Sequence, residues 1–171
     1  MNRFLVLLAL LAGAQASAQH HGHSHSPYAG EEVRDIKALS AQEQRAWLEG
    51  QGLGLARAAE LNGHPGPMHV LEHGQALELS AEQQARTHAL MHRHKTEVRA
   101  LGAELVAAER RLDELFRTRR ATPDNVNELT ATIGGLQARI RASHLNTHLE
   151  QTRLLRPEQV AAYDRLRGYA R

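Results

Sequence analysis

Histidine is the residue type in this chain whose number and spacing could do chemistry. Twelve of the 171 residues are histidine, whereas the sequence contains no cysteine. Without cysteine the chain has no disulfide, no thiolate metal site and no cysteine nucleophile. Neutral imidazole is the commonest side-chain ligand of metal ions in proteins. The composition therefore indicates a metal site built from histidine.

Three groups of residues have the spacing of ligands on a helix. Side chains three or four residues apart lie one turn apart on the same side of a helix. The groups with this spacing are His69 with His73, His88 with Met91 and His92, and His144 with His148. Imidazole and thioether donors favour Cu, Ni, Co or Zn over Ca or Mg. We expect a divalent transition metal to bind some of these residues, and the sequence leaves open which of them converge.

A secretion signal precedes the first histidines. Arg3 is followed by an apolar stretch over residues 4–12 and by Ala-Ser-Ala at 16–18, which is typical of a cleavage site. The apolar stretch is shorter than the roughly 20 residues that span a bilayer, so a cleaved leader is favoured over a membrane anchor. We expect residues 1–18 to be removed and the mature protein to reside in the periplasm.

The new N-terminus would itself be a candidate metal site. If the mature chain begins at Gln19, its α-amine, two backbone amides and the imidazole of His21 form a square-planar nitrogen set, which suits Cu(II) or Ni(II). His20 lies inside this set, and two further histidines follow within four residues. A tail that only aids solubility is the alternative. Cyclisation of Gln19 to pyroglutamate would remove the amine and the site.

The remaining composition predicts an all-α protein. Leu, Ala, Glu, Gln and Arg predominate, and aromatic residues make up only 4% of the chain. These residue types favour helix over sheet. The net charge is +2, and basic and acidic residues are interspersed. We therefore expect no nucleic-acid partner.

Local patterns divide the chain into four segments. They are a signal peptide (1–18), a His-rich disordered arm (19–30), a weakly helical extension and linker (31–67) and a helical-hairpin domain (68–171). Ser40 and Glu43 have the spacing of a capping box inside the extension. Glycine and proline over residues 63–67 mark the linker.

Two long helices should form an antiparallel hairpin with short helices around its open end. Ser80 caps the first, over 81–120, and Thr122 caps the second, which begins at Pro123 and reaches Leu155. The apolar stripes of the two helices are Val98, Leu101, Leu105, Ala108, Leu112 and Leu115 on the first, and Leu129, Ile133, Leu136 and Ile140 on the second. Such a thin hairpin exposes an apolar flank, so we expect a homodimer.

The turn also predicts which side chains face each other. If Phe116 pairs with Leu129, His148 falls opposite Glu97 and His144 falls opposite Leu101. This register places His148 near His94.

One short pattern occurs twice, as Leu79-Ser80-Ala81-Glu82-Gln83 and as Leu155-Arg156-Pro157-Glu158-Gln159. Here the sequence resembles the periplasmic Spy/CpxP-like family, known for two Leu-Thr-x-x-Gln motifs on a four-helix hairpin. The resemblance covers about residues 68–169. Ser80 and Arg156 stand where the family motif has Thr, and Arg156 lacks the capping hydroxyl. The family includes ATP-independent chaperones as well as heavy-metal sensors and binders.

The resemblance extends to the CnrX-type metal sensors of this family. It implies a ligand pair at His69 and His73, one residue away from the position that the sensors use before the first motif. It also implies a second pair at about His144 and His148, one helical turn earlier than the sensors place it before the second motif. A carboxylate ligand of those sensors falls near Met91 and His92, so its type would differ here. The resemblance therefore implies a metal site in this region with a changed ligand set.

Two functions remain open. The first is a metal-binding protein for sensing, buffering or resistance, with a membrane-bound sensor or signalling partner. The second is a holdase chaperone whose partners are unfolded client proteins, and metal could modulate it. The segment 69–73 also matches the H-x-x-E-H signature of a metalloprotease, with Glu72 as general base. That activity needs a further acidic ligand and a larger scaffold, so we expect the protein not to be an enzyme.

Overall fold

The computed structural model describes residues 26–169, and within them it is helical, with no strand. The chain forms two compact units, residues 1–30 and 31–171. Of the first unit only 26–30 are described, as a turn in which the Ala29 N–H donates to the Ser26 carbonyl at 2.9 Å. The signal peptide, His20 and His21 lie outside the described residues. No helix within 26–169 is long and apolar enough to cross a bilayer.

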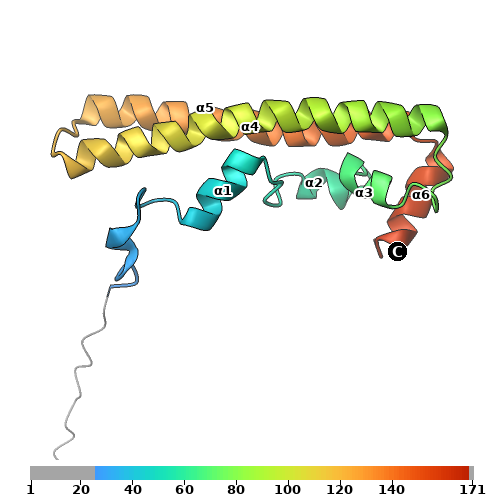
Figure 1. The fold of residues 1–171 in the computed structure, drawn as a ribbon, viewed down its shortest axis with the longest axis horizontal. Helices are drawn as coiled ribbons and strands as arrows, with labels where there is room; N and C mark the ends of the chain where they lie inside the picture. Colours follow the sequence, from blue (N-terminus) through green and yellow to red (C-terminus); the bar gives the residue numbers. More distant parts are fainter. Residues whose placement is uncertain (1–25, 170–171) are drawn as a thin grey trace, which may run out of the picture. The chain divides into compact units, whose positions relative to one another are not determined.

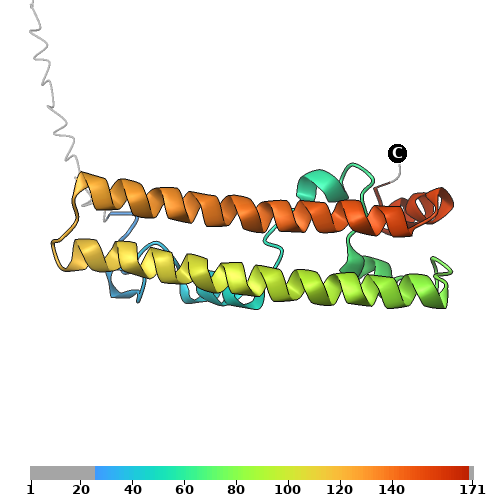
Figure 2. The same cartoon turned by 90° about the horizontal axis from the view of Figure 1, so that it is seen from above.

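The second unit is built on the expected hairpin. Helix α4 (Ala81–Arg117) and helix α5 (Pro123–Leu154) run antiparallel and side by side, as Figures 1 and 2 show. At the start of α4 the Ser80 hydroxyl accepts from the Gln83 N–H at 3.1 Å, and the Gln83 side chain accepts from the Ser80 N–H at 3.0 Å. Thr122 and Asn125 form the same reciprocal box at the start of α5. The all-α hairpin fold is confirmed, and so are both caps.

The apolar stripes meet in the seam between α4 and α5. Its buried members are Val98, Leu101, Leu105, Ala108, Ile133, Leu136 and Ile140, with Leu112 partly buried beside them. Leu105 is only 1% exposed. Burial of such side chains is the main favourable term in folding, so this seam holds the hairpin together.

The expected register across the hairpin is wrong. Ser143, and not His148, faces Glu97, and His144 faces His94 rather than Leu101. The reason lies at the turn. Helix α4 ends at Arg117 and not at residue 120, Arg119 takes a left-handed φ of 57°, and the chain is helical again from Pro123. This turn leaves Phe116 60% exposed to solvent, outside the seam.

Short helices line one side of the hairpin (Figure 1). They are α1 (Ala41–Glu49), α2 (Arg57–Glu60) and α3 (Pro67–Glu72). The capping box of Ser40 and Glu43 at the start of α1 is present. Helix α1 approaches α4 at Gly102, where a Cβ would lie 2.1 Å from the Trp47 carbonyl oxygen. Segment 31–67, expected as an extension and linker, therefore packs along the hairpin.

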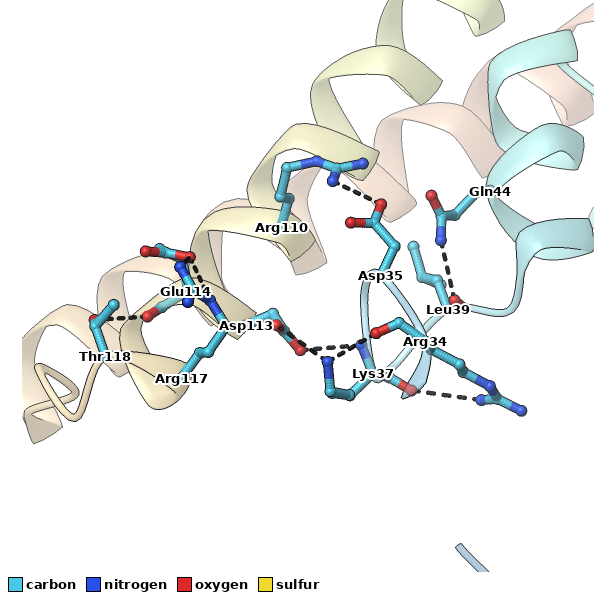
Figure 3. A network of polar contacts seen from close by, with 10 residues as sticks. All are labelled: Arg34, Asp35, Lys37, Leu39, Gln44, Arg110, Asp113, Glu114, Arg117 and Thr118. Carbon is cyan, nitrogen blue, oxygen red and sulfur yellow. Dashed lines mark hydrogen bonds and ion pairs between the residues drawn. The ribbon is translucent and has the colours of Figure 1, made fainter. Parts of the chain in front are cut away.

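The start of this unit is fastened to α4 by the polar network of Figure 3. The unit begins with a 3-10 turn, η1 (Glu31–Val33). The Lys37 N–H donates to the Asp113 carboxylate at 3.0 Å, and Arg110 pairs with Asp35 at 2.6 Å. Between these contacts Ile36 is fully buried, in a cluster with Val106 of α4.

Helix α6 (Pro157–Leu166) covers the open end of the hairpin. Its Tyr163 is fully buried beside Val70 of α3. The glutamines of the two repeated motifs meet here. The Gln83 amide donates to Gln159 at 2.8 Å, and the Gln159 amide donates back at 3.1 Å. The duplicated pattern thus encodes a contact that joins α4 to α6.

Candidate metal centre

Histidines from α3, α4 and α5 line one groove of about 550 Å³. The glycine-rich loop 50–54, helix α2 and the two long helices also contribute to its lining. Its donor-bearing side chains are Met68, His69, Met91, His94, His144 and His148. The groove therefore gathers residues that lie up to 80 positions apart in the sequence.

His94 and His144 form a close pair between the long helices. The Nε2 atom of His94 lies 3.1 Å from the Nδ1 atom of His144, and the ring centroids are 4.5 Å apart in an edge-to-face arrangement. His144 is 6% exposed. Its Nε2 atom is buried and has no hydrogen-bond partner.

The hydrogen-bond network around this pair assigns its tautomers. The Ser143 hydroxyl donates to the Glu97 carboxylate at 2.8 Å, because a carboxylate can only accept. The Ser143 oxygen is then the acceptor for the Nδ1–H of His94, at 3.1 Å. Neutral His94 therefore accepts at Nε2 from the Nδ1–H of His144. This series of hydrogen bonds ends at the Nε2 atom of His144, whose lone pair has no donor.

The electrostatics of the pair keep both rings neutral. Burial, together with the nearby His94, His148 and Lys95, lowers the pKa of His144 to about 4. Burial also lowers the pKa of His94, although the charge of Glu97 opposes that shift. Only a neutral imidazole can bind a metal. His144 is thus held in the ligand-competent form well below pH 7.

His148 lies one turn after His144 on α5, and its ring is also fixed by a hydrogen bond from one nitrogen. Its Nδ1–H donates to the His64 carbonyl at 2.7 Å, and its Nε2 atom lies against Gly66, where a Cβ would come within 2.9 Å of it. The ring is nearly buried, with 13% of its side chain exposed. Histidine ligands of metals usually donate their second ring N–H to a carbonyl or carboxylate. Both histidines of the His144/His148 group therefore have one nitrogen anchored and the other left as an acceptor.

The half-buried carboxylate of Glu60 lies next to His148. The Glu60 Oε2 atom lies 3.5 Å from the His148 Nδ1 atom and has no hydrogen-bond partner. The Oε1 atom accepts from the Tyr163 hydroxyl at 2.5 Å and lies 3.7 Å from the Arg167 guanidinium. Burial and the hydrogen bond to Glu60 raise the pKa of Tyr163 well above its ordinary range. Glu60 thus links the groove to helix α6.

Of the other histidines with ligand spacing, His69 also lines the groove, whereas His73, His88 and His92 do not. The His69 Nδ1 atom is bonded to Glu72 at 2.6 Å. His73 caps α3 and presents its ring to Tyr163, with 6.5 Å between the ring centroids. His88 and His92 are exposed on α4, whereas Met91 lines the groove. Within residues 26–169 no group of three or more His, Asp or Glu side chains is arranged to hold a metal.

His94 was not among the ligands predicted from the sequence. His94 follows Met91 by three residues, which is the same helical spacing that selected the other groups. Ser143 and His64 carried no such signal, because their roles depend on contacts with segments far away in the chain. The donor set nonetheless fits a transition metal. The unpartnered, buried Nε2 of His144 is the atom that such an ion would satisfy.

The fold and the groove define an all-α hairpin protein with a histidine-lined groove beside its open end. The sequence profile described as heavy-metal resistance matches residues 52–162, nearly two thirds of the chain. The chain belongs to this heavy-metal resistance family, which agrees with the resemblance to the metal-sensing branch of the Spy/CpxP-like proteins. Comparisons with curated proteins and with solved structures gave no match.

Proposed function

We propose that the protein binds a transition metal ion in the groove, as an exported protein of metal sensing, buffering or resistance. His144 and His148 supply imidazole ligands, and Met91 supplies a thioether. His94 is a positioning residue, since its Nε2 holds the Nδ1–H of His144. The observation that carries the proposal is the buried Nε2 of His144, which has no partner while the rest of its ring is anchored.

The groove supplies what a ligand pair needs before the metal arrives. Both imidazoles are oriented by their second nitrogen, so little side-chain freedom is lost on binding. The desolvated environment keeps His144 neutral, so no proton has to leave it at pH 7. Together these features support high affinity at a site with few protein ligands.

Binding of Zn(II) and Ag(I) by matched double variants of the full mature chain tests the proposal. His144→Gln with His148→Gln should lose the tightest site for at least one of the two ions, as measured by competition with a chelator. His88→Gln with His92→Gln is the control, because it removes two exposed histidines of α4 and leaves the groove intact. Circular dichroism should show the same helix content in both variants. Equal binding of both ions by wild type and the groove variant would refute the proposed site.

Exposed apolar side chains of the same groove support the alternative function, a holdase chaperone. Leu53, Leu61 and Met68 are 49%, 55% and 48% exposed there, and exposed apolar surface is what a client-binding protein requires. Suppression of client aggregation in the presence of a chelator would support this function. The groove variant would then protect clients as well as wild type does, although it no longer binds metal.

A further inference from the structure

Sulfur donors concentrate at the proposed site. The protein has three methionines, of which Met68 and Met91 are among the described residues. Both of these line the groove that holds His144 and His148. They come from α3 and α4, so the packing of the two helices brings them to the same place. A thioether is a soft, uncharged donor, and it favours Cu(I) over harder divalent ions.

The charges of the groove oppose a divalent ion. Three basic residues line it, Arg57, Lys95 and Arg167, against one acidic residue, Glu60. The charge of Glu60 is offset by Arg167, which lies 3.7 Å from its Oε1 atom, and the same oxygen accepts from the Tyr163 hydroxyl. Coulomb repulsion from a fixed positive charge is twice as large for a dication as for a monocation at the same position. The desolvation cost of an ion rises with the square of its charge, which widens the difference in a half-buried groove.

The number of donors points the same way. A zinc site takes three or four His, Cys, Asp or Glu ligands from the protein, and residues 26–169 offer no cluster of three. The groove offers two anchored imidazoles and two thioethers, all uncharged. Bound to these ligands, a monovalent ion carries a single charge, whereas a divalent ion keeps both.

We propose that the groove is selective for a soft monovalent cation, Cu(I) in the cell, with Ag(I) as its redox-inert counterpart. This inference rests on the proposed metal-binding function and replaces the divalent ion expected from the histidine spacing alone. Met91 and Met68 are then ligands or near neighbours of the ion, and Lys95 discriminates against divalent competitors.

Methyl NMR of the full mature protein labelled at the methionine methyl carbon provides a direct test. Ag(I) is diamagnetic, and the labelled methyls report on the groove even if histidines elsewhere in the chain also take up metal. One equivalent of Ag(I) should shift the signals of Met68 and Met91, which Met68→Leu and Met91→Leu assign. Zn(II), which is also diamagnetic, should leave these two signals unshifted at one equivalent.

Affinities measured by chelator competition complete the test. Met91→Leu keeps the size of the side chain and removes the sulfur, so it should weaken Ag(I) and Cu(I) binding by about tenfold and leave Zn(II) unchanged. Lys95→Gln should raise the Zn(II) affinity more than the Ag(I) affinity.

The outcomes separate this inference from the function on which it rests. Zn(II) or Ni(II) binding that depends on His144 and His148, without a methionine shift under Ag(I), overturns the selectivity and keeps the metal site. If the His144→Gln, His148→Gln variant binds every metal as wild type does, both the selectivity and the metal site are overturned.

Discussion

The Nδ1 atom of His144 donates a hydrogen bond to the Nε2 atom of His94 across the hairpin, at 3.1 Å. This contact places two neutral imidazoles beside the apolar seam, where each stabilises the tautomer of the other. A buried polar pair of this kind is stable only while its hydrogen bonds are satisfied. Protonation of His94 would remove the acceptor from the contact, and protonation of His144 would place a charge at its buried, unpartnered Nε2 atom. The pair is therefore sensitive to pH in the folded protein.

The first prediction concerns stability as the pH falls. In the unfolded chain His144 takes up a proton near its ordinary pKa of 6.5, whereas in the folded protein the pKa is about 4. The unfolded state then binds more protons over this range, so the contribution of His144 to stability is present above pH 6.5 and is lost towards pH 4. Urea unfolding at pH 7 and pH 4.5 should show this loss.

His144→Gln provides the comparison for that measurement. This variant should be less stable at pH 7 and should lose less stability than wild type on going to pH 4.5. His92→Gln is the control, because His92 is exposed on the same hairpin, and it should keep the wild-type pH dependence. A pH dependence unchanged by His144→Gln would contradict the assignment of the shift to the buried ring.

The second prediction concerns the glutamine pair of the repeated motif. Gln159 is 2% exposed, and its amide also donates to the Leu77 carbonyl at 3.0 Å. Gln159→Ala leaves that carbonyl without its donor and removes both hydrogen bonds to Gln83, whose amide keeps only the Leu154 carbonyl, so it should cost about 1–3 kcal/mol of unfolding free energy. Gln84→Ala removes a neighbouring, exposed glutamine whose amide makes a single hydrogen bond, to the Leu79 carbonyl at 3.2 Å, so it should cost only about 0.5 kcal/mol.

The features that the sequence could predict are local ones. The box of Ser80 and Gln83 depends on residues three apart, and the seam around Leu105 depends on helical periodicity, so both follow from short windows of sequence. The partner of His144 does not. It is decided by the turn between Arg117 and Pro123, and a different turn would have placed another side chain against His94.

The third prediction concerns the seam between the long helices. Leu105→Asp places an unpaired carboxylate at a position that is 1% exposed, which should destabilise the protein by several kcal/mol. Phe116→Asp is the matched control, since Phe116 lies on the same helix but is 60% exposed. Thermal unfolding of the two variants should differ widely. Similar melting temperatures would show that the seam does not carry the stability of the hairpin.

The fourth prediction concerns the N-terminus and rests on the sequence alone. Mass spectrometry of the exported protein should find a mature chain that begins at Gln19 with a free amine. Cu(II) titration should then show a tight site that His21→Ala removes. His20→Ala is the control, because the backbone amide of residue 20 remains while its imidazole is lost. A cyclised Gln19 or a different cleavage position would rule out this site and leave the groove unaffected.

The last prediction uses two helical glycines that differ in their surroundings. At Gly102 of α4 an added Cβ would lie 2.1 Å from the Trp47 carbonyl oxygen, so Gly102→Ala should force α1 away from the hairpin and cost about 1–3 kcal/mol. At Gly134 of α5 nothing lies within 4 Å, so Gly134→Ala should stabilise its helix by about 1 kcal/mol. Trp47 is the only tryptophan of the protein, and its fluorescence reports on α1 directly. We expect the emission to shift to longer wavelength in Gly102→Ala and to stay unchanged in Gly134→Ala. An unshifted emission and equal stability in the two variants would show that α1 does not pack on α4 at Gly102.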